Sequence, residues 1–288
     1  MFEAVPSPYL VDPESFRIKD SPTKPPKDTP SKKDLEHALE DEVDQIAKLQ
    51  RVLYAEDQWS LLLVFQAMDA AGKDGTIRAV LSGVNPAGCQ VHSFKAPSSG
   101  ELEHDFLWRT TTKLPERGRI GIFNRSYYEE VLIVRVHPGI LDNQRIPDLE
   151  VGNALWDGRL ESIRDHEAHL ARNGTAIVKF FLNVSKDEQR DRFLDRLDEP
   201  DKNWKFNAAD VAEREHWDDY MHAYEQALRG TSRPWAPWYA IPADNKRYMR
   251  LCVARVIRES LESLGLDYPT VSADDRERFG KMRKRLES

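Results

Sequence analysis

The sequence predicts an α/β fold built around a parallel sheet, and three observations support this prediction. The run Leu61–Phe65 is continuously apolar and has the length of a strand, which is typical of a strand buried on both faces. The glycine-containing segment Asp69–Gly75 follows closely and leads into the helical pattern of Thr76–Leu81. Further apolar runs recur along the chain with a helical stretch between each pair, and this alternation favours parallel strands.

The first 30 residues differ from the rest of the chain. Residues 1–30 hold seven of the 17 prolines and show no sustained periodicity, which predicts a proline-rich extended arm. From Ser31 to Leu53, apolar residues recur at steps of three and four, which predicts a helix that packs on the body. Because 288 residues is near the upper size of a single core, we expect residues 31–288 to form one domain.

Capping residues mark two further helices. Ser185 and Glu188 have the spacing of a capping box, so a helix is expected to begin there. Asn207 is expected to cap a helix that runs to about Leu228, with Gly230 as its left-handed C-terminal residue. The other expected strands are Gln90–Phe94, Arg119–Phe123, Ala176–Val184 and Trp238–Ile241.

Composition argues against several classes of protein. The net charge of −7 disfavours general adhesion to nucleic acid or to anionic membranes, although a local basic groove could still hold a polyanion. No apolar run approaches the ~20 residues that span a bilayer. Cys89 and Cys252 are far apart and do not suggest a disulfide framework. We therefore expect a cytoplasmic protein that binds neither nucleic acid nor membrane.

The turn Asp69–Gly75 has the features of a phosphate-binding loop. A strand that turns through glycines into a helix aims several backbone amides and the helix dipole at one anion. Gly72 and Gly75 permit close approach of the backbone, and Lys73 adds a positive charge where a transferred phosphoryl group would lie. The turn residues expected to bind phosphate or nucleotide are Ala70, Ala71, Gly72, Asp74, Gly75 and Thr76.

The same turn departs from the pattern G-x-x-x-x-G-K-[ST] at two positions. Ala67 replaces the first glycine, and Asp74 follows Lys73 where a magnesium-binding hydroxyl would stand. Asp69 is the nearest hard oxygen ligand, so we expect it to hold the metal. The alternative is an ordinary strand-to-helix turn of an α/β protein.

A second polar cluster follows the strand expected at Arg119–Phe123. Ligands of parallel sheets bind beyond the carboxyl ends of the strands, which is where this cluster lies. Asn124 could ligate metal or orient a phosphate, and Arg125 could bridge phosphate oxygens with its planar guanidinium. Glu129 and Glu130 could bind metal or fix a basic partner. The alternative is an N-capped amphipathic helix with solvated glutamates.

Three motifs, in order along the chain, resemble one known family. Phe65–Leu81, Phe123–Glu130 and Trp204–Phe206 are similar to motifs of the type 2 polyphosphate kinases, and the likeness extends from about Leu35 to about Leu264. The resemblance implies a P-loop kinase fold with three α/β/α layers, similar to that of thymidylate kinase, and a helical lid. It also implies magnesium-dependent, reversible transfer of phosphoryl groups between inorganic polyphosphate and nucleotides.

The resemblance also implies roles for individual residues. Asp69 and Lys73 match the acid and the lysine of the family's phosphate loop, and Arg125 matches its phosphate-gripping arginine. These three are the expected catalytic residues. Those that match the family's second polar cluster are Asn124, Glu129 and Glu130. Basic residues of the expected lid, at about residues 186–206, are Arg190, Arg192 and Lys205.

Asn124 bears on the choice of acceptor. Some family members have Asp at this position, and the Asn form resembles the subgroup that accepts both AMP and ADP. The expected partners are therefore inorganic polyphosphate and adenine nucleotides, with guanine nucleotides left open. The resemblance also favours a homo-oligomer.

Two further groups of residues bear on the substrates: one side chain of the lid, and the basic residues that an extended polyphosphate chain would need along its path. Trp204 is expected either to stack on adenine as part of the lid or to anchor its loop to the body. Basic candidates for the path, besides Lys73 and Arg125, are Lys95, Arg109, Lys113, Arg117 and Arg119.

Two other functions remain open. One is a kinase that phosphorylates a nucleotide or small molecule with ATP, since the same fold would serve. The other is a regulatory nucleotide-binding module that hydrolyses slowly and signals by changing shape. The strand ending at Asn124 lacks the terminal acid of a typical Walker B element, which argues against the module.

Overall fold

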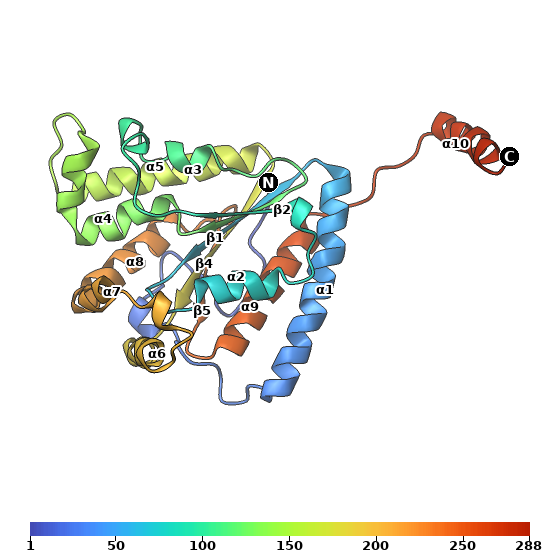
Figure 1. Cartoon of the computed structure of the whole chain (residues 1–288). Coiled ribbons are helices and arrows are strands. Elements are labelled where there is room, and N and C mark those ends of the chain that lie inside the picture. Colours follow the sequence, from blue (N-terminus) through green and yellow to red (C-terminus); the bar gives the residue numbers. More distant parts are fainter.

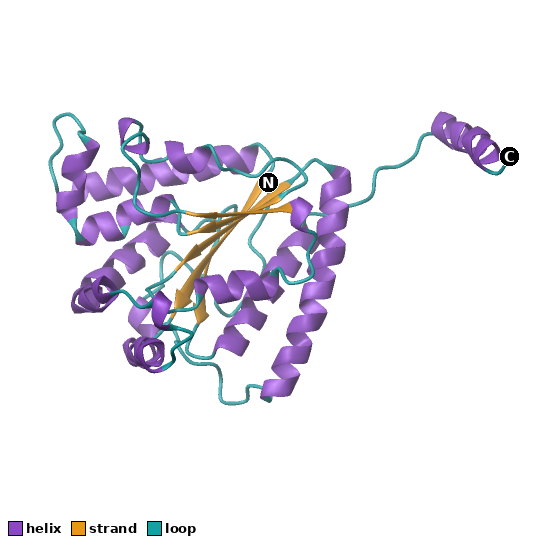
Figure 2. Cartoon of the chain, viewed as in Figure 1, coloured by secondary structure: helices purple, strands orange, loops and turns teal.

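A five-stranded parallel sheet forms the centre of the computed structural model, which describes residues 1–288 apart from the side chain of Lys205 (Figures 1 and 2). The strand order across the sheet is β2-β3-β1-β4-β5. All five predicted strands are confirmed, with ends displaced by at most one residue. Their bounds are β1 (Ser60–Gln66), β2 (Cys89–Ser93), β3 (Ile120–Asn124), β4 (Thr175–Asn183) and β5 (Trp238–Pro242).

Helices cover both faces of the sheet, which confirms the expected three-layer α/β/α fold. In Figure 1, α1, α2 and α9 group on one side of the strands, and α4, α5 and α8 group on the other. The helices are α1 (Lys32–Glu56), α2 (Lys73–Val80), α3 (Trp108–Thr111), α4 (Ile133–Val136), α5 (Asn153–Arg172), α6 (Lys186–Asp198), α7 (Ala208–Glu213), α8 (Trp217–Thr231), α9 (Lys246–Ser263) and α10 (Ala273–Leu286).

The apolar runs explain why β1 and β4 lie at the centre of the sheet. Every residue of β1 is buried, and every residue of β4 after Thr175 is buried. At the edge, β2 exposes several of its residues, in keeping with its more polar sequence. The predicted cap Ser185 is confirmed, because its hydroxyl accepts from the Glu188 amide at the start of α6. Ser31 caps α1 in the same way by accepting from the Asp34 amide, a cap that was not predicted.

The prediction for residues 207–230 needs correction. Asn207 does cap a helix, but the stretch that follows is divided into α7 and α8 by a short 3₁₀ turn. Gly230 lies within α8 and does not end it in a left-handed conformation. A Cβ atom at Gly230 would lie 3.0 Å from Leu160 Cδ1, so the glycine allows α8 to approach α5 closely.

The first residues of the chain run along the edge of the sheet beside β5. Leu10 forms an antiparallel bridge with Tyr239, and the Val11 amide donates to the Trp238 carbonyl at 2.9 Å. Phe2, Val5 and Val11 are buried in the core. The arm therefore covers a strand edge that would otherwise expose unpaired backbone groups.

Helix α10 stands apart from the body in Figures 1 and 2. None of its residues, all of which the structure describes, is buried. In the described part of the chain, no helix combines the length and the apolar character needed to cross a membrane.

Candidate functional site

The two predicted polar loops meet at the end of the sheet where the carboxyl ends of the strands lie. Strands β1 and β3 are parallel neighbours, and their register pairs Phe65 with Asn124. The loop after β1 and the loop after β3 therefore leave the sheet side by side. The carboxyl ends of the strands are where ligands of open parallel sheets bind.

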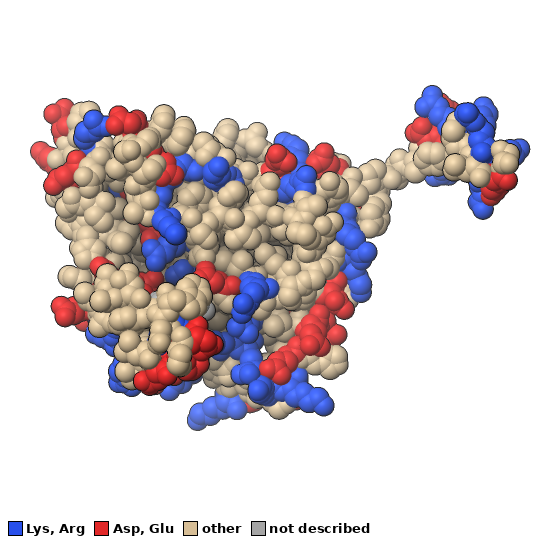
Figure 3. All heavy atoms as spheres, in the orientation of Figure 1, with Lys and Arg blue, Asp and Glu red and all other residues tan. Residues whose placement is uncertain are grey.

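A hollow of about 670 Å³ opens between these loops. The whole turn Asp69–Gly75 lines it, and Asn124 and Arg125 line it from β3. Among the described residues, nine Lys or Arg and only three Asp contribute to its wall. Figure 3 shows basic side chains along the middle of this face, over α2 and toward the start of α9. The hollow is therefore built for an anion, in a chain whose net charge is −7.

The turn after β1 has the backbone shape of an anion-binding loop. Gly72 precedes α2 with φ of 107°, a conformation that side chains disfavour, and Ala70 is also left-handed at φ 60°. The ammonium of Lys73 lies 2.8 Å from the Ala67 carbonyl and so spans the turn. Burial lowers the pKa of Lys73, and Arg125 lowers it further, although Asp69 opposes the shift.

Arg125 brings two of the predicted carboxylates together. Its Nη2 lies 2.9 Å from Asp69 Oδ1, and its Nη1 lies 3.5 Å from Glu129 Oε2. Gln66 Nε2 donates to the other oxygen of Glu129 at 2.8 Å. Burial works against the charge of Arg125, but Glu129 and Asp69 outweigh it and raise its pKa. Asn124 Nδ2 donates to Asp74, which links the second loop to the start of α2.

The carboxylate of Asp69 fits a divalent metal of the magnesium kind. The described residues include no cluster of three His, Cys, Asp or Glu side chains that could enclose an ion. Magnesium at phosphate sites is commonly held by one or two carboxylates and completes its shell with phosphate oxygens and water. Asp69 lies on the wall of the hollow and supplies such a carboxylate.

Glu130 lies apart from Glu129, although the sequence placed the two together. The segment Tyr127–Val131 is a 3₁₀ helix, in which consecutive side chains point about 120° apart. Glu130 is buried and pairs with Arg159 at 3.0 Å. It lines a second hollow of about 380 Å³, next to Phe106 and Arg109.

The two lid arginines point in different directions. Arg190 is exposed and pairs with Asp187 and Asp191, and it is not among the described residues that line the main hollow. Arg192 is buried and donates to the carbonyls of Ala70 at 3.0 Å and Ala71 at 2.7 Å. Residues two apart on a helix point about 200° apart, which separates these side chains.

Helix α6 is thus fastened to the phosphate loop. Besides Arg192, buried Gln189 donates to the Asp69 carbonyl at 2.9 Å. Nη2 of Arg192 reaches the Ala243 carbonyl, just beyond β5, at 2.6 Å. The Lys205 side chain lies outside the described residues. Trp204 is 79% exposed, which argues against the alternative in which it anchors its loop to the body.

Several basic residues of the hollow were not predicted. They lie on α2, α6 and α9, and they are Arg78, Arg196, Lys246 and Arg250. The pair Lys246-Arg247, at the start of α9 and four residues beyond the end of β5, was the available signal, since it follows the carboxyl end of a strand. Arg117 and Arg119 are wrong as parts of a phosphate path, because they lie at the amino ends of the strands, where Arg117 donates to the Gln58 carbonyl.

Comparisons with known proteins find relatives along most of the chain. The family model described as polyphosphate kinase 2 matches residues 29–266. The ADP-polyphosphate phosphotransferase of Rhodopseudomonas palustris is 59% identical over 257 residues, which cover 89% of each chain. The AMP/ADP-polyphosphate phosphotransferase of Meiothermus ruber is 48% identical over 78% of this chain and 80% of that protein. The crystal structure of polyphosphate kinase 2 from Arthrobacter aurescens TC1 matches with a TM-score of 0.87 and 38% identity, covering 98% of both chains.

Proposed function

This chain belongs to the polyphosphate kinase 2 family, and we propose how its main hollow moves phosphoryl groups between polyphosphate and nucleotides. The proposal rests on the charge of the wall of the hollow, to which nine basic and three acidic side chains contribute. Polyphosphate carries roughly one negative charge per residue, so a donor chain needs several cations in succession. A hollow for a single phosphate would need far fewer.

The phosphate loop would hold the phosphoryl group during its transfer. The backbone amides at the start of α2 and the helix dipole face the hollow, and Lys73 and Arg125 add two full charges. The transition state of phosphoryl transfer spreads negative charge over three oxygens, which these groups would neutralise. When bound through Asp69, magnesium would add its charge at the same oxygens. An acceptor phosphate is already ionised at neutral pH, so the transfer requires no strong base.

The second hollow is suited to the base of the acceptor nucleotide. It adjoins the main hollow, because Lys95 lines the main one and its carbonyl accepts from Arg109, which lines the second, at 2.7 Å. Phe106 offers a ring, and Glu101 and Glu130 offer carboxylates to the exocyclic amino group of a purine. Both adenine and guanine carry such a group, so this hollow would admit either base. The adenine nucleotides in the names of the relatives make these the first acceptors to test.

The testing experiment combines the purified protein with magnesium, long-chain polyphosphate and ADP. ATP should accumulate, and it should not accumulate when the metal is chelated or the polyphosphate is omitted. AMP in place of ADP should yield ADP and then ATP. A folded protein that makes no ATP from polyphosphate but phosphorylates a small molecule with ATP would favour the ordinary kinase instead.

We further propose that the chain works in the cytoplasm as a homo-oligomer. Both Cys89 and Cys252 are free thiols, as is usual in a reducing compartment. The resemblance to the family supports the oligomer. Light scattering after gel filtration would give its mass, and a mass of one chain at working concentration would contradict this part of the proposal.

A further inference from the structure

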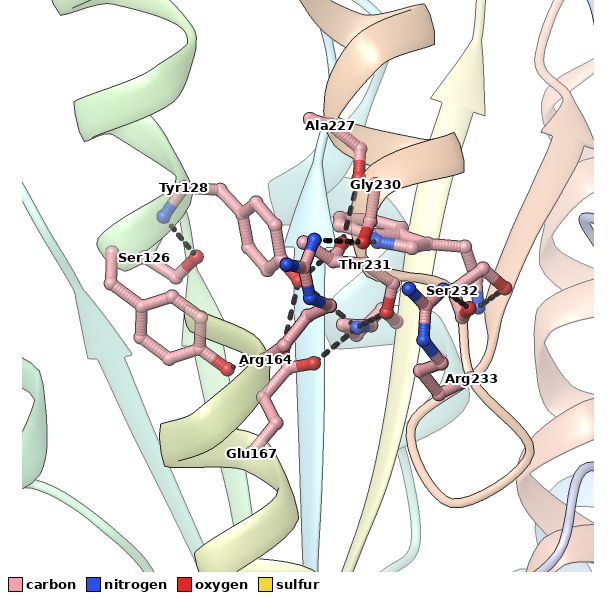
Figure 4. Close-up of polar contacts among 12 residues, drawn as sticks. Ser126, Tyr128, Arg164, Glu167, Ala227, Gly230, Thr231, Ser232 and Arg233 are labelled. Carbon is pink, nitrogen blue, oxygen red and sulfur yellow. Dashed lines mark hydrogen bonds and ion pairs between the residues drawn. The ribbon is translucent and has the colours of Figure 1, made fainter. Parts of the chain in front are cut away.

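A fully buried ion pair lies behind the loop that follows β3. This loop, residues 125–131, is called the second site loop. Lys179 is in β4 and Glu167 is in α5, and their side chains are 0% and 1% exposed. Lys179 Nζ lies 2.5 Å from Glu167 Oε2, and it also contacts the Tyr128 hydroxyl and the Thr231 carbonyl, each at 2.9 Å. All three N–H groups of the ammonium are therefore used. Figure 4 shows Glu167, Tyr128 and Thr231 converging on one point between the sheet and α8.

Stability alone does not account for this pair. Removing two charges from water is costly, and well-packed apolar side chains often stabilise a core equally well. The surroundings are strongly apolar, with the rings of Tyr128 and Trp238 centred 5.4 and 5.3 Å from Lys179 Nζ. Burial lowers the pKa of Lys179 to about 8, even though Glu167 opposes the shift. Such an arrangement fixes geometry, because the ammonium, the carboxylate and the hydroxyls all find their hydrogen-bond partners within the cluster.

What the pair fixes is the backbone of the second site loop. Glu167 Oε1 accepts from the hydroxyl of Tyr127 at 2.9 Å and lies 2.8 Å from that of Tyr128. Burial, followed by the charge of Glu167, raises the pKa of both tyrosines well above its usual value, so they stay protonated. These two residues stand between Arg125, which lines the main hollow, and Glu129, which pairs with Arg125. The carboxylate of Glu167 thus holds the side chains of Tyr127 and Tyr128, two consecutive residues of the second site loop.

Arg125 needs such support because of its own conformation. Its φ is 62°, in the left-handed region that residues with a side chain disfavour. Strained conformations of this kind persist only where the surroundings hold them. On one side, the Arg125 amide donates to the Phe65 carbonyl at 3.0 Å. On the other side, the chain runs directly into the anchored tyrosines.

We propose that Lys179 and Glu167 are positioning residues for phosphoryl transfer, acting through the hydroxyls of Tyr127 and Tyr128 to hold Arg125 and Glu129 in place. This inference rests on the proposed function of the main hollow. The pair touches no substrate. Its effect arises because a small misplacement of a charged group costs far more in the transition state than in the bound ground state.

The test compares tyrosine variants that each lose one buried hydroxyl. Tyr128→Phe should lower kcat at least ~10-fold while KM for polyphosphate and for ADP changes less than about threefold. The matched control is Tyr239→Phe, because the buried Tyr239 hydroxyl donates to the Val5 carbonyl at 2.9 Å, away from the loop. It should keep kcat within about twofold. Equal kcat for the two variants would overturn the proposal.

A second measurement reports on the loop without any activity. Amide hydrogen exchange of residues 125–131 should be at least ~10-fold faster in Tyr128→Phe and in Glu167→Gln than in the wild type. Tyr239→Phe should leave these amides unchanged. If Glu167→Gln does not fold, the tyrosine variant still decides. If the wild type transfers no phosphate, the proposed function fails by itself, and exchange alone decides whether the pair holds the loop: unchanged exchange overturns it.

Discussion

Lys73 lies at the point where the backbone of the phosphate loop turns into α2. Its ammonium reaches the Ala67 carbonyl across the turn, and Asp69 and Arg125 lie close enough to shift its pKa in opposite directions. A phosphate held by the loop amides would meet this charge first. We therefore propose that Lys73 contributes to the chemistry and not to the packing of the fold.

Lys73→Ala should lower kcat at least ~10²-fold, because it removes one full charge from the stabilisation of the transition state. The far-ultraviolet circular dichroism and the unfolding midpoint should stay close to those of the wild type. Lys48→Ala, at an exposed position on α1, is the control for loss of a lysine and should turn over normally. Near-normal turnover of Lys73→Ala would remove this residue from the site.

Helix α6 supports the phosphate loop more than it covers it. Arg192 and Gln189 donate to three carbonyls of the loop, and Arg192 also holds the chain beyond β5. The first turns of α6 are therefore part of the rigid site. A lid that closes over phosphate has to move beyond them, in the segment that leads from Arg196 to α7.

Arg192→Ala should lower kcat at least ~10-fold, because the loop carbonyls lose their partner and the left-handed turn at Ala70 loses its support. The control is Arg229→Ala, since Arg229 also donates to a main-chain carbonyl, that of Pro13, but on α8. Assays of both variants at saturating polyphosphate would separate the loss of support for the phosphate loop from the loss of an arginine–carbonyl hydrogen bond elsewhere in the fold. If both arginines cost the same small amount, α6 does not support the loop.

The strands and the helix caps could be predicted from the sequence because both depend on local signals. Apolar runs and capping side chains act within a few residues, and the two loops follow their strands directly. The direction of neighbouring side chains was harder to predict. Glu130 turns away from Glu129 because the segment is a 3₁₀ helix, and Arg192 turns inward because α6 docks on the loop. Gly230 was misplaced because its role lies in the contact with Leu160, which is distant in sequence.

The chain as a whole separates its basic from its acidic side chains. The net charge is −7, yet the wall of the main hollow is strongly basic among the residues described. Acidic side chains gather elsewhere, as along α1 in Figure 3. Because salt screens charges over ~8–10 Å, a polyanion near the hollow responds to the local field and not to the total charge. Transfer from polyphosphate should therefore weaken as salt is added.

The two ends of the chain differ in how they join the body, and deleting each end tests this difference. Deletion of residues 1–11 should lower the free energy of unfolding by several kcal/mol, because Phe2, Val5 and Val11 are buried and each such side chain contributes ~1.5–3 kcal/mol. Deletion of residues 268–288 removes α10 and should change the unfolding midpoint by less than about 2 °C, since none of its described residues is buried. Thermal unfolding of both truncated chains, followed by circular dichroism, measures the contrast. An unchanged midpoint after the first deletion would mean that the arm contributes nothing at the edge of β5. A large drop after the second would mean that α10 docks on the protein in solution.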